Sequence, residues 1–319
     1  MEKLLEVKDL KVSFFTDLGE TQAVKDAGFA IEEGDFFGIV GESGSGKSVT
    51  TKSILRLGPS NCRIMGGEIL FQGEDILKKS EAELREIRGG EIAMIFQDSL
   101  SALNPVYTVG NKMVELIRRH TSMTKKEAKA RVLELLTAVG ITDPEKAMRS
   151  YPHELSGGMR QRVMIAMAMS SNPKVLIADE PTTALDVTIQ AQILHLLLEL
   201  QKKNNMSIIL ITHDLGVVAQ TCKRVAVMCG GYVVEEGTVE EIFLNPGHPY
   251  TQALIASMRR VGGTFEQFLE RDLSDGSGNL CPFLNRCKYA DKTCEACLPK
   301  YYESSENHKI LCHRREEEK

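Results

Sequence analysis

The stretch that most constrains the fold of this 319-residue chain is GESGSGKS at residues 41–48, which follows a short apolar run, DFFGIV at 35–40. The eight residues fit the pattern G-x-x-x-x-G-K-[S/T], and a helical stretch begins at Lys47. Glycines let such a loop curl so that its backbone N–H groups point at phosphate oxygens, and the start of the next helix adds partial positive charge. This order of strand, loop and helix predicts a phosphate-binding loop (P-loop) in an α/β protein.

The residue types within the P-loop suit a nucleoside triphosphate bound with Mg²⁺. Gly44 and Gly46 permit the turn, and Lys47 supplies a point charge to the β- and γ-phosphates. The hydroxyl of Ser48 can ligate the metal ion. The residues expected to contact the nucleotide here are Gly41, Ser43, Gly44, Ser45, Gly46, Lys47, Ser48 and Val49.

A second motif, VLIADE, ends an apolar strand with Asp179 and places Glu180 directly after it. An aspartate at such a strand end can hold Mg²⁺ through water, and the next carboxylate can orient and deprotonate an attacking water. Two carboxylates alone would equally suit a solvated strand end. Beside a P-loop they indicate hydrolysis of the nucleotide.

Short apolar runs alternate with helical patterns along much of the chain. Strand patterns cover residues 3–15, 35–40, 68–72, 91–97, 175–179 and 207–212. Buried strands that alternate with helices predict an α/β fold with a mostly parallel sheet. Helical patterns from 109 to 140 interrupt the alternation, so we expect a separate lobe in the middle of the chain.

A third motif, ELSGGMRQR at 154–162, lies before the acidic strand. A P-loop, an LSGG sequence and an acidic strand in this order resemble the ATP-binding cassette (ABC) superfamily, over about residues 3–245. The resemblance implies a P-loop NTPase fold with a RecA-like core, an N-terminal antiparallel β subdomain and a helical lobe that carries the signature. We therefore expect an ABC nucleotide-binding domain at 1–245, with the helical lobe at about 98–155.

The resemblance assigns catalytic roles to four residues. Glu180 matches the general base, and Lys47 matches the lysine that stabilises phosphate charge. Gln97 in IFQD and His213 in LITHD match the residues that sense the γ-phosphate and the attacking water. The chain is therefore expected to hydrolyse ATP.

Further matches concern binding. Phe14 is expected to stack on adenine, with Phe15 as the alternative. The residues expected to ligate Mg²⁺ are Ser48, Gln97 and Asp179. The signature and D-loop residues expected to contact nucleotide are Ser156, Gly157, Gly158 and Asp186. The signature departs from the general pattern at Met159, where glutamine is usual, but methionine at this place is typical of peptide importers.

The resemblance also implies a sandwich dimer in which each ATP lies between the P-loop of one subunit and the signature of the other. Helix N-termini attract anions, so a signature at the start of a helix suits the γ-phosphate. ATP binding then closes the dimer and hydrolysis opens it. The second ATPase is either an identical or a related chain, and we expect a related one in the full transporter.

Two segments narrow the resemblance to the ATPases of dipeptide and oligopeptide importers. These are FQDSLSALNP at 96–105 and NPGHPYTQALIASM at 245–258. That family carries a C-terminal extension, which we expect at 246–319. Its implied partners are two transmembrane permease subunits, a second ATPase and, indirectly, an extracytoplasmic peptide-binding protein. Whether the solute is a dipeptide, a longer peptide or a nickel complex stays open.

Five of the eight cysteines lie near the end of the chain, four of them in CPFLNRCKYADKTCEAC at 281–297. The family resemblance implies a 4Fe–4S cluster on Cys281, Cys287, Cys294 and Cys312. Zinc is the alternative, because Cys294 and Cys297 form a C-x2-C pair, and His313 is a further possible ligand. We expect the segment to have little core of its own and a metal group to act as its staple.

The sequence favours a protein on the cytoplasmic face of a membrane, bound peripherally. Its N-terminus, MEKLLEVKDL, lacks the apolar region of a secretory signal, and its apolar runs are too short to span a bilayer. The formal net charge of −5 argues against nucleic acid as a partner. The alternative is a soluble ABC ATPase that acts on nucleic acid or ribosomes, although such proteins usually carry two cassettes or a long coiled-coil insertion.

Overall fold

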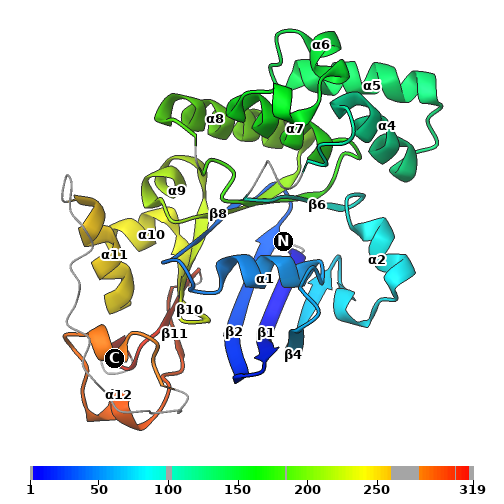
Figure 1. The fold of residues 1–319 in the computed structure, drawn as a ribbon. Coiled ribbons are helices and arrows are strands. Elements are labelled where there is room, and N and C mark those ends of the chain that lie inside the picture. The colour runs from blue at the N-terminus through cyan, green and yellow to red at the C-terminus, as the bar shows by residue number, and fades with distance from the viewer. Residues whose placement is uncertain (1–2, 98–102, 184, 260–279, 306, 316–319) are drawn as a thin grey trace. The chain divides into compact units, whose positions relative to one another are not determined.

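The structure is a computed structural model that describes residues 3–97, 103–183, 185–259, 280–305 and 307–315. The chain divides into two compact units. The first unit contains Met1–Leu77 and Thr212–Lys319, and the second contains Lys78–Ile211. Each unit combines strands and helices, as predicted for an α/β protein (Figure 1). The strand pairing is mixed, however, and not mostly parallel as the sequence predicts, because the first unit is largely antiparallel.

The first unit begins with an antiparallel sheet. It contains β1 (Lys3–Thr16), β2 (Gly19–Glu32), β4 (Cys62–Phe71) and the short β5 (Glu74–Asp75). The strand β1 lies between β2 and β4 and pairs antiparallel with both. This sheet corresponds to the N-terminal antiparallel β subdomain that the family resemblance implies.

The P-loop follows the strand at the opposite end of this unit's strand order from β5. It connects β3 (Phe36–Val40), whose five residues are all buried, to α1 (Lys47–Ile54). The strand β3 pairs parallel with β9 (Arg224–Cys229), which pairs antiparallel with β10 (Tyr232–Thr238). The sequence analysis missed β9 and β10, which join β3 to β2 in the order β2-β10-β9-β3.

The C-terminal segment, described at residues 280–305 and 307–315, is part of this unit. The strand β12 (His308–Leu311) pairs antiparallel with β10, and β11 (Tyr301–Ser305) pairs with β12. The side chains of Phe283 and Leu311 are each 2% exposed and belong to the same apolar core as Val40 and Tyr250. The expectation of a segment with little core is therefore wrong for the described part, since it shares the core of the first unit.

Short helices complete the first unit. They are α9 (Leu215–Thr221), α10 (Val239–Leu244), α11 (Pro249–Arg259) and α12 (Lys292–Ala296), with 3-10 turns at Leu284–Arg286 and His313–Arg315. The helix α11 begins at Pro249, within the segment 245–258 that resembles the importer family.

The second unit contains a parallel sheet in the order β8-β7-β6. Its strands are β6 (Ile92–Ile95), β7 (Val175–Asp179) and β8 (Ser207–Thr212), and the middle strand β7 is buried along its whole length. Parallel strands covered on both faces are expected to be continuously apolar, as these are.

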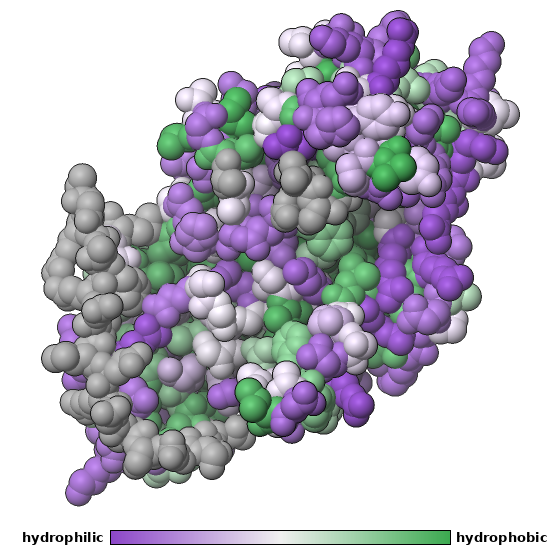
Figure 2. All heavy atoms as spheres, viewed as in Figure 1, coloured by the Kyte–Doolittle hydropathy of each residue, from purple (hydrophilic) through white to green (hydrophobic). Residues whose placement is uncertain are grey.

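Six α-helices of the second unit lie within its described residues. They are α2 (Glu81–Ile87), α4 (Val109–His120), α5 (Lys125–Ala138), α6 (Pro144–Arg149), α7 (Gly157–Ala168) and α8 (Val187–Asn204). Helices α4 to α7 pack together (Figure 1), and the first three of them lie within the range 98–155 predicted for the helical lobe. The helix α5 starts with a capping box between Thr124 and Glu127 and ends before Gly140, which has φ +78°. Figure 2 shows mainly hydrophilic side chains on the outer face of this lobe.

A helix that spans a bilayer must be long and predominantly apolar. Within the described ranges, none combines enough length with enough apolar character to be a membrane span.

Candidate functional site

The P-loop backbone adopts the conformation that its glycines permit. Gly41, Gly44 and Gly46 have φ values of +153°, +80° and +103°. A Cβ atom on Gly41 would lie 2.1 Å from the Met228 carbonyl oxygen, and one on Gly46 would lie 2.8 Å from the Ala23 carbonyl oxygen. At Gly44 no described atom would lie within 4 Å, so its backbone conformation alone requires glycine.

Lys47 connects the two ends of the loop. Its ammonium group donates hydrogen bonds of 2.8 Å to the carbonyl oxygens of Gly41 and Glu42. The helix α1 begins at Lys47, and its N-cap is Gly46. Ser43 and Gly44 are exposed at the tip, Ser45 is buried, and Ser48 and Val49 are half-buried. The loop thus presents a helix start and a lysine together, the combination that binds phosphate.

The two candidate adenine-stacking residues lie side by side on β1. Successive residues of a strand point to opposite faces, so only one of them can face a nucleotide. The Arg63 guanidinium lies 5.1 Å from the ring centre of Phe15 and occupies one ring face. Both rings are half-buried, so Phe15 differs from Phe14 in this arginine contact rather than in burial.

His213 belongs to the first unit as well and is exposed directly after β8. The next residue, Asp214, caps α9 by accepting hydrogen bonds from the backbone N–H groups of Gly216 and Val217, at 2.7 and 3.2 Å. The helix start fixes the backbone beside His213.

The second unit brings Gln97 and Glu180 together. The Gln97 amide nitrogen donates a 2.9 Å hydrogen bond to the Glu180 carboxylate, which also accepts a 2.9 Å bond from the Thr183 hydroxyl. Both residues follow neighbouring parallel strands, since Ile95 of β6 pairs with Ala178 of β7. Carboxyl ends of parallel strands meet at one edge of a sheet, where α/β proteins bind their ligands. The sequence analysis missed Thr183.

The backbone of Glu180 is strained. Its φ of +46° lies in the left-handed region, which costs a residue other than glycine on the order of 1–3 kcal/mol. Asp179, the last residue of β7, is 1% exposed. Strain of this kind concentrates at functional sites, where it fixes the direction of a side chain.

The signature residues surround the start of α7. The Ser156 hydroxyl accepts a 3.3 Å hydrogen bond from the backbone N–H of Met159 and so caps the helix. A Cβ on Gly158 would lie 3.1 Å from a side-chain carbon of Ile189 on α8, and one on Gly157 would lie 3.5 Å from Leu185. The two glycines therefore allow the chain after the acidic strand to approach the signature closely.

Asp186 forms the cap of the neighbouring helix α8. Its carboxylate accepts a 3.0 Å hydrogen bond from the backbone N–H of Ile189. Two capped helix starts, those of α7 and α8, thus lie near each other in the second unit. The P-loop belongs to the first unit, whereas these two helix starts belong to the second.

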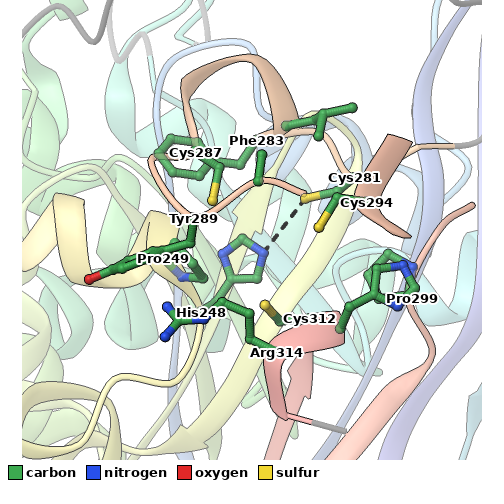
Figure 3. Close-up of a pocket in the computed structure, with 13 residues that line it drawn as sticks. His248, Pro249, Cys281, Phe283, Cys287, Tyr289, Cys294, Pro299, Cys312 and Arg314 are labelled. Carbon is green, nitrogen blue, oxygen red and sulfur yellow. Dashed lines mark hydrogen bonds between the residues drawn. The ribbon is translucent and has the colours of Figure 1, made fainter. Parts of the chain in front are cut away.

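A cavity in the first unit gathers four cysteines (Figure 3). The sulfur atoms of Cys281, Cys287, Cys294 and Cys312 point toward the same space, which is also lined by His248. Burial, with a smaller contribution from the three neighbouring thiols, raises the pKa of the Cys281 thiol to about 12. The imidazole of His248 lies 3.9 Å from the sulfur of Cys281, and burial lowers the pKa of His248 to about 4.

The expectation that this C-terminal extension binds a metal, either in a 4Fe–4S cluster or as zinc, is not supported. Among the residues that the structure describes, no group of three or more His, Cys, Asp or Glu side chains is arranged to hold a metal ion. The four sulfurs surround a cavity without forming such a group. Cys297 is exposed and does not line this cavity; its sulfur lies 3.9 Å from a ring nitrogen of His313, which does line it.

Comparison with known proteins identifies two matching families. Residues 24–183 match the family "ABC transporter", and residues 234–294 match "Oligopeptide/dipeptide transporter, C-terminal region". The chain is 56% identical to the oligopeptide transport ATP-binding protein OppD of Bacillus subtilis over 84% of this chain and 75% of that protein. It is 48% identical to the dipeptide transport ATP-binding protein DppD of the same organism over 98% of this chain and 95% of that protein.

Solved structures show the same fold. An ATP-binding cassette, MJ0796, whose dimeric structure contains ADP and Pi, matches with a TM-score of 0.67 and 29% identity. The match covers 74% of this chain and 98% of that one. The protein cbiO1 of Clostridium perfringens, part of an ABC transporter complex, matches with a TM-score of 0.65 and 30% identity over 82% of this chain and 96% of that one.

Proposed function

Because the chain belongs to the ABC transporter ATP-binding proteins that carry the oligopeptide/dipeptide transporter C-terminal region, we propose that it hydrolyses ATP to power the import of peptides. The pair of Gln97 and Glu180 at the ends of β6 and β7 carries the hydrolytic part of the proposal. The similarity to DppD over 98% of the chain supports peptides as the solute.

Four residues have proposed roles in ATP hydrolysis, each based on the chemistry of its side chain. Glu180 acts as the general base that takes a proton from the attacking water, while Gln97 orients that water. Lys47 neutralises charge on the β- and γ-phosphates, and His213 contacts the γ-phosphate. Bound Mg²⁺ supplies further positive charge to the phosphates. The residues proposed to hold it are Ser48, Gln97 and Asp179.

Dimerisation completes the nucleotide site in this proposal. The start of α7, with Ser156, Gly157 and Gly158, contacts the γ-phosphate of ATP on a second ATPase, and Asp186 lies at the same junction. Phe14 stacks on the adenine. The partner is an identical or a related ATPase. Loss of the γ-phosphate removes the shared contact, so hydrolysis opens the dimer.

The permease partners bind the second unit. Its surface contains a mainly apolar hollow, which His120 and Ser170 line together with Gly89, Ala93, Met94, Phe96, Leu103, Leu116, Met164, Met167 and Ala168. The side chain of Phe96, next to Gln97, is 38% exposed. An apolar hollow beside a residue that orients water suits helices from two transmembrane permease subunits, and an extracytoplasmic binding protein then delivers peptide to the complex. The chain itself lies peripherally on the cytoplasmic face.

The test compares stimulators of ATP turnover. We expect permease subunits reconstituted with the chain and a second ATPase to raise its ATP hydrolysis, and peptide-loaded binding protein to raise it further. DNA, RNA and ribosomes are expected to change the rate by less than about twofold, because the chain has a net charge of −5. Stimulation by nucleic acid or ribosomes without permease would favour the alternative, a soluble ABC ATPase.

Residues 246–319 form the importer-type extension in this proposal, and its four cavity cysteines bind a 4Fe–4S cluster. A cluster distributes its thiolates over four irons, whereas zinc requires them around one ion. Four thiols that line one cavity match the number of donors that such a cluster requires. The donors are Cys281, Cys287, Cys294 and Cys312, and the cluster would supply a rigid cross-link.

Metal analysis tests this assignment. Protein purified without oxygen is expected to contain about four irons and four sulfides per chain, with broad visible absorption. A Cys287→Ala variant is expected to lose most of the iron, while Cys297→Ala, which alters an exposed cysteine outside the cavity, keeps it. One zinc without sulfide, or no metal at all, would contradict the cluster and leave the ATPase proposal intact.

A further inference from the structure

The C-terminal segment contacts the P-loop directly. The guanidinium of Arg286 donates hydrogen bonds to both carboxylate oxygens of Glu42, the second residue of the P-loop, at 2.9 to 3.0 Å. The two side chains are 24% and 34% exposed. Bidentate arginine–carboxylate pairs fix geometry as well as charge. This pair therefore ties the P-loop to a residue 244 positions later in the sequence.

A second contact holds the same P-loop residue through its backbone. The N–H group of Glu42 donates a 2.9 Å hydrogen bond to the Tyr250 hydroxyl, and the Tyr250 side chain is fully buried. The carbonyl of Glu42 meanwhile accepts a hydrogen bond from Lys47. All three polar groups of Glu42 thus have partners, and one of these is the lysine expected to bind phosphate.

The Arg286 side chain is held by aromatic rings. Its guanidinium lies 5.1 Å from the ring centre of Phe283 and 5.9 Å from that of Tyr250, and the two rings pack edge to face at 5.5 Å. The 3-10 turn Leu284–Arg286 sets the arginine between Cys281 and Cys287. Arg286 is therefore placed by the same short loop that supplies two of the cavity cysteines.

The turn at Gly230 and Gly231, which contacts the P-loop, also contacts the segment 281–287. The N–H of Gly231 donates a 3.0 Å hydrogen bond to the carbonyl of Ser45 in the P-loop. A Cβ on the neighbouring Gly230 would lie 2.7 Å from the ring of Pro282. Pro282 therefore packs against the turn that binds Ser45. This is a second, indirect contact between the segment 281–287 and the P-loop.

We propose that Arg286 is a positioning residue for the nucleotide site, so that the segment 281–287 sets the affinity of the P-loop for ATP. Arg286 orients Glu42 and neutralises its charge. Without the guanidinium, the Glu42 carboxylate would be an uncompensated negative charge on a loop that binds a polyanion. The inference rests on the proposed function, because it assumes that ATP binds at this P-loop.

The experiment measures ATP binding to the full chain by calorimetry in the presence of Mg²⁺, with protein purified without oxygen. Arg286→Gln is expected to raise the Kd for ATP about tenfold, a loss of about 1.4 kcal/mol. ADP, which carries less charge, is expected to lose less. Lys292→Met is the matched control, because it removes one positive charge from an exposed position of the same segment.

A charge-rescue variant separates positioning from a general loss of stability. Adding Glu42→Gln to Arg286→Gln removes the uncompensated carboxylate and is expected to restore most of the affinity. A purely structural role for Arg286 would lower the thermal midpoint without such rescue. Two milder variants serve if Arg286→Gln does not fold. Tyr250→Phe tests the backbone contact with Glu42, and Arg286→Lys keeps the charge without the bidentate geometry. Each is expected to raise the Kd for ATP about threefold.

The outcomes separate this inference from the function on which it rests. Wild-type binding of ATP with an unchanged Kd in Arg286→Gln and Tyr250→Phe would overturn the positioning role and leave the ATPase proposal standing. A wild-type chain that binds no ATP would overturn the proposed function itself. Weakened binding in Arg286→Gln that Glu42→Gln does not restore would also count against the proposed neutralisation of charge.

Discussion

We expect ATP hydrolysis to fall by about 10²–10⁴-fold when Glu180 is replaced by glutamine, while ATP still binds. The amide has nearly the same shape, and the Thr183 hydroxyl that donates to the carboxylate can donate to the amide oxygen as well. It cannot take a proton from water. ATP turnover under saturating ATP and Mg²⁺, measured with the permease subunits present, gives the rate.

The same variant is expected to accumulate a closed dimer with ATP, because the γ-phosphate that joins the two ATPases is not removed. Size-exclusion chromatography with and without ATP detects this species. Glu199→Gln is the matched control, since Glu199 is 65% exposed on α8 and contacts only His195 among the ion pairs of the described chain. Wild-type hydrolysis by Glu180→Gln would remove Glu180 from the role of general base.

A second large effect is expected at Glu235, which holds the C-terminal segment on the first unit. Its carboxylate is fully buried and accepts hydrogen bonds from the backbone N–H groups of Gly247 and His248, at 2.7 and 2.9 Å. It also pairs with the buried imidazole of His308 on β12 at 2.7 Å. Replacement by alanine leaves these partners buried without their carboxylate, so we expect the free energy of unfolding to fall by about 3–5 kcal/mol.

Urea unfolding followed by circular dichroism measures this loss, and limited proteolysis shows whether cleavage begins in residues 280–315. Glu303→Ala is the control, because Glu303 lies on β11 of the same segment with its side chain 66% exposed. A loss below about 1 kcal/mol at Glu235, within the range of surface substitutions, would show that the buried pair does not anchor the segment.

The sequence predicts best what local chemistry determines. The P-loop is specified within eight residues, and each glycine in it corresponds to a positive φ or a close backbone approach. The closeness of Gln97 and Glu180 also follows from a local pattern. Each residue comes after a strand, the two strands are parallel neighbours, and such strands end at the same edge of a sheet.

Long-range pairing is what the sequence does not reveal. The sequence of β11 and β12 is largely polar and charged. These strands join the sheet of the first unit because β12 pairs with β10, where Ile310 lies opposite Glu235 and Lys309 opposite Glu236. Likewise, Arg286 lies between two cysteines in the sequence, and no neighbouring residue predicts its contact with Glu42. Contacts of this kind depend on the assembled fold, so they appear in neither periodicity nor spacing.

The division of the first unit into two separate stretches of sequence has a consequence for synthesis on the ribosome. Strand β2 leaves the ribosome early, yet its neighbour β10, which reaches it where Tyr232 pairs with Asp26, is translated only after the whole second unit. Until then one edge of β2 has no strand beside it, and an uncovered edge is a template for pairing between chains. The nascent chain therefore passes through a stage in which the second unit can be complete while the nucleotide-binding unit still awaits its last strands.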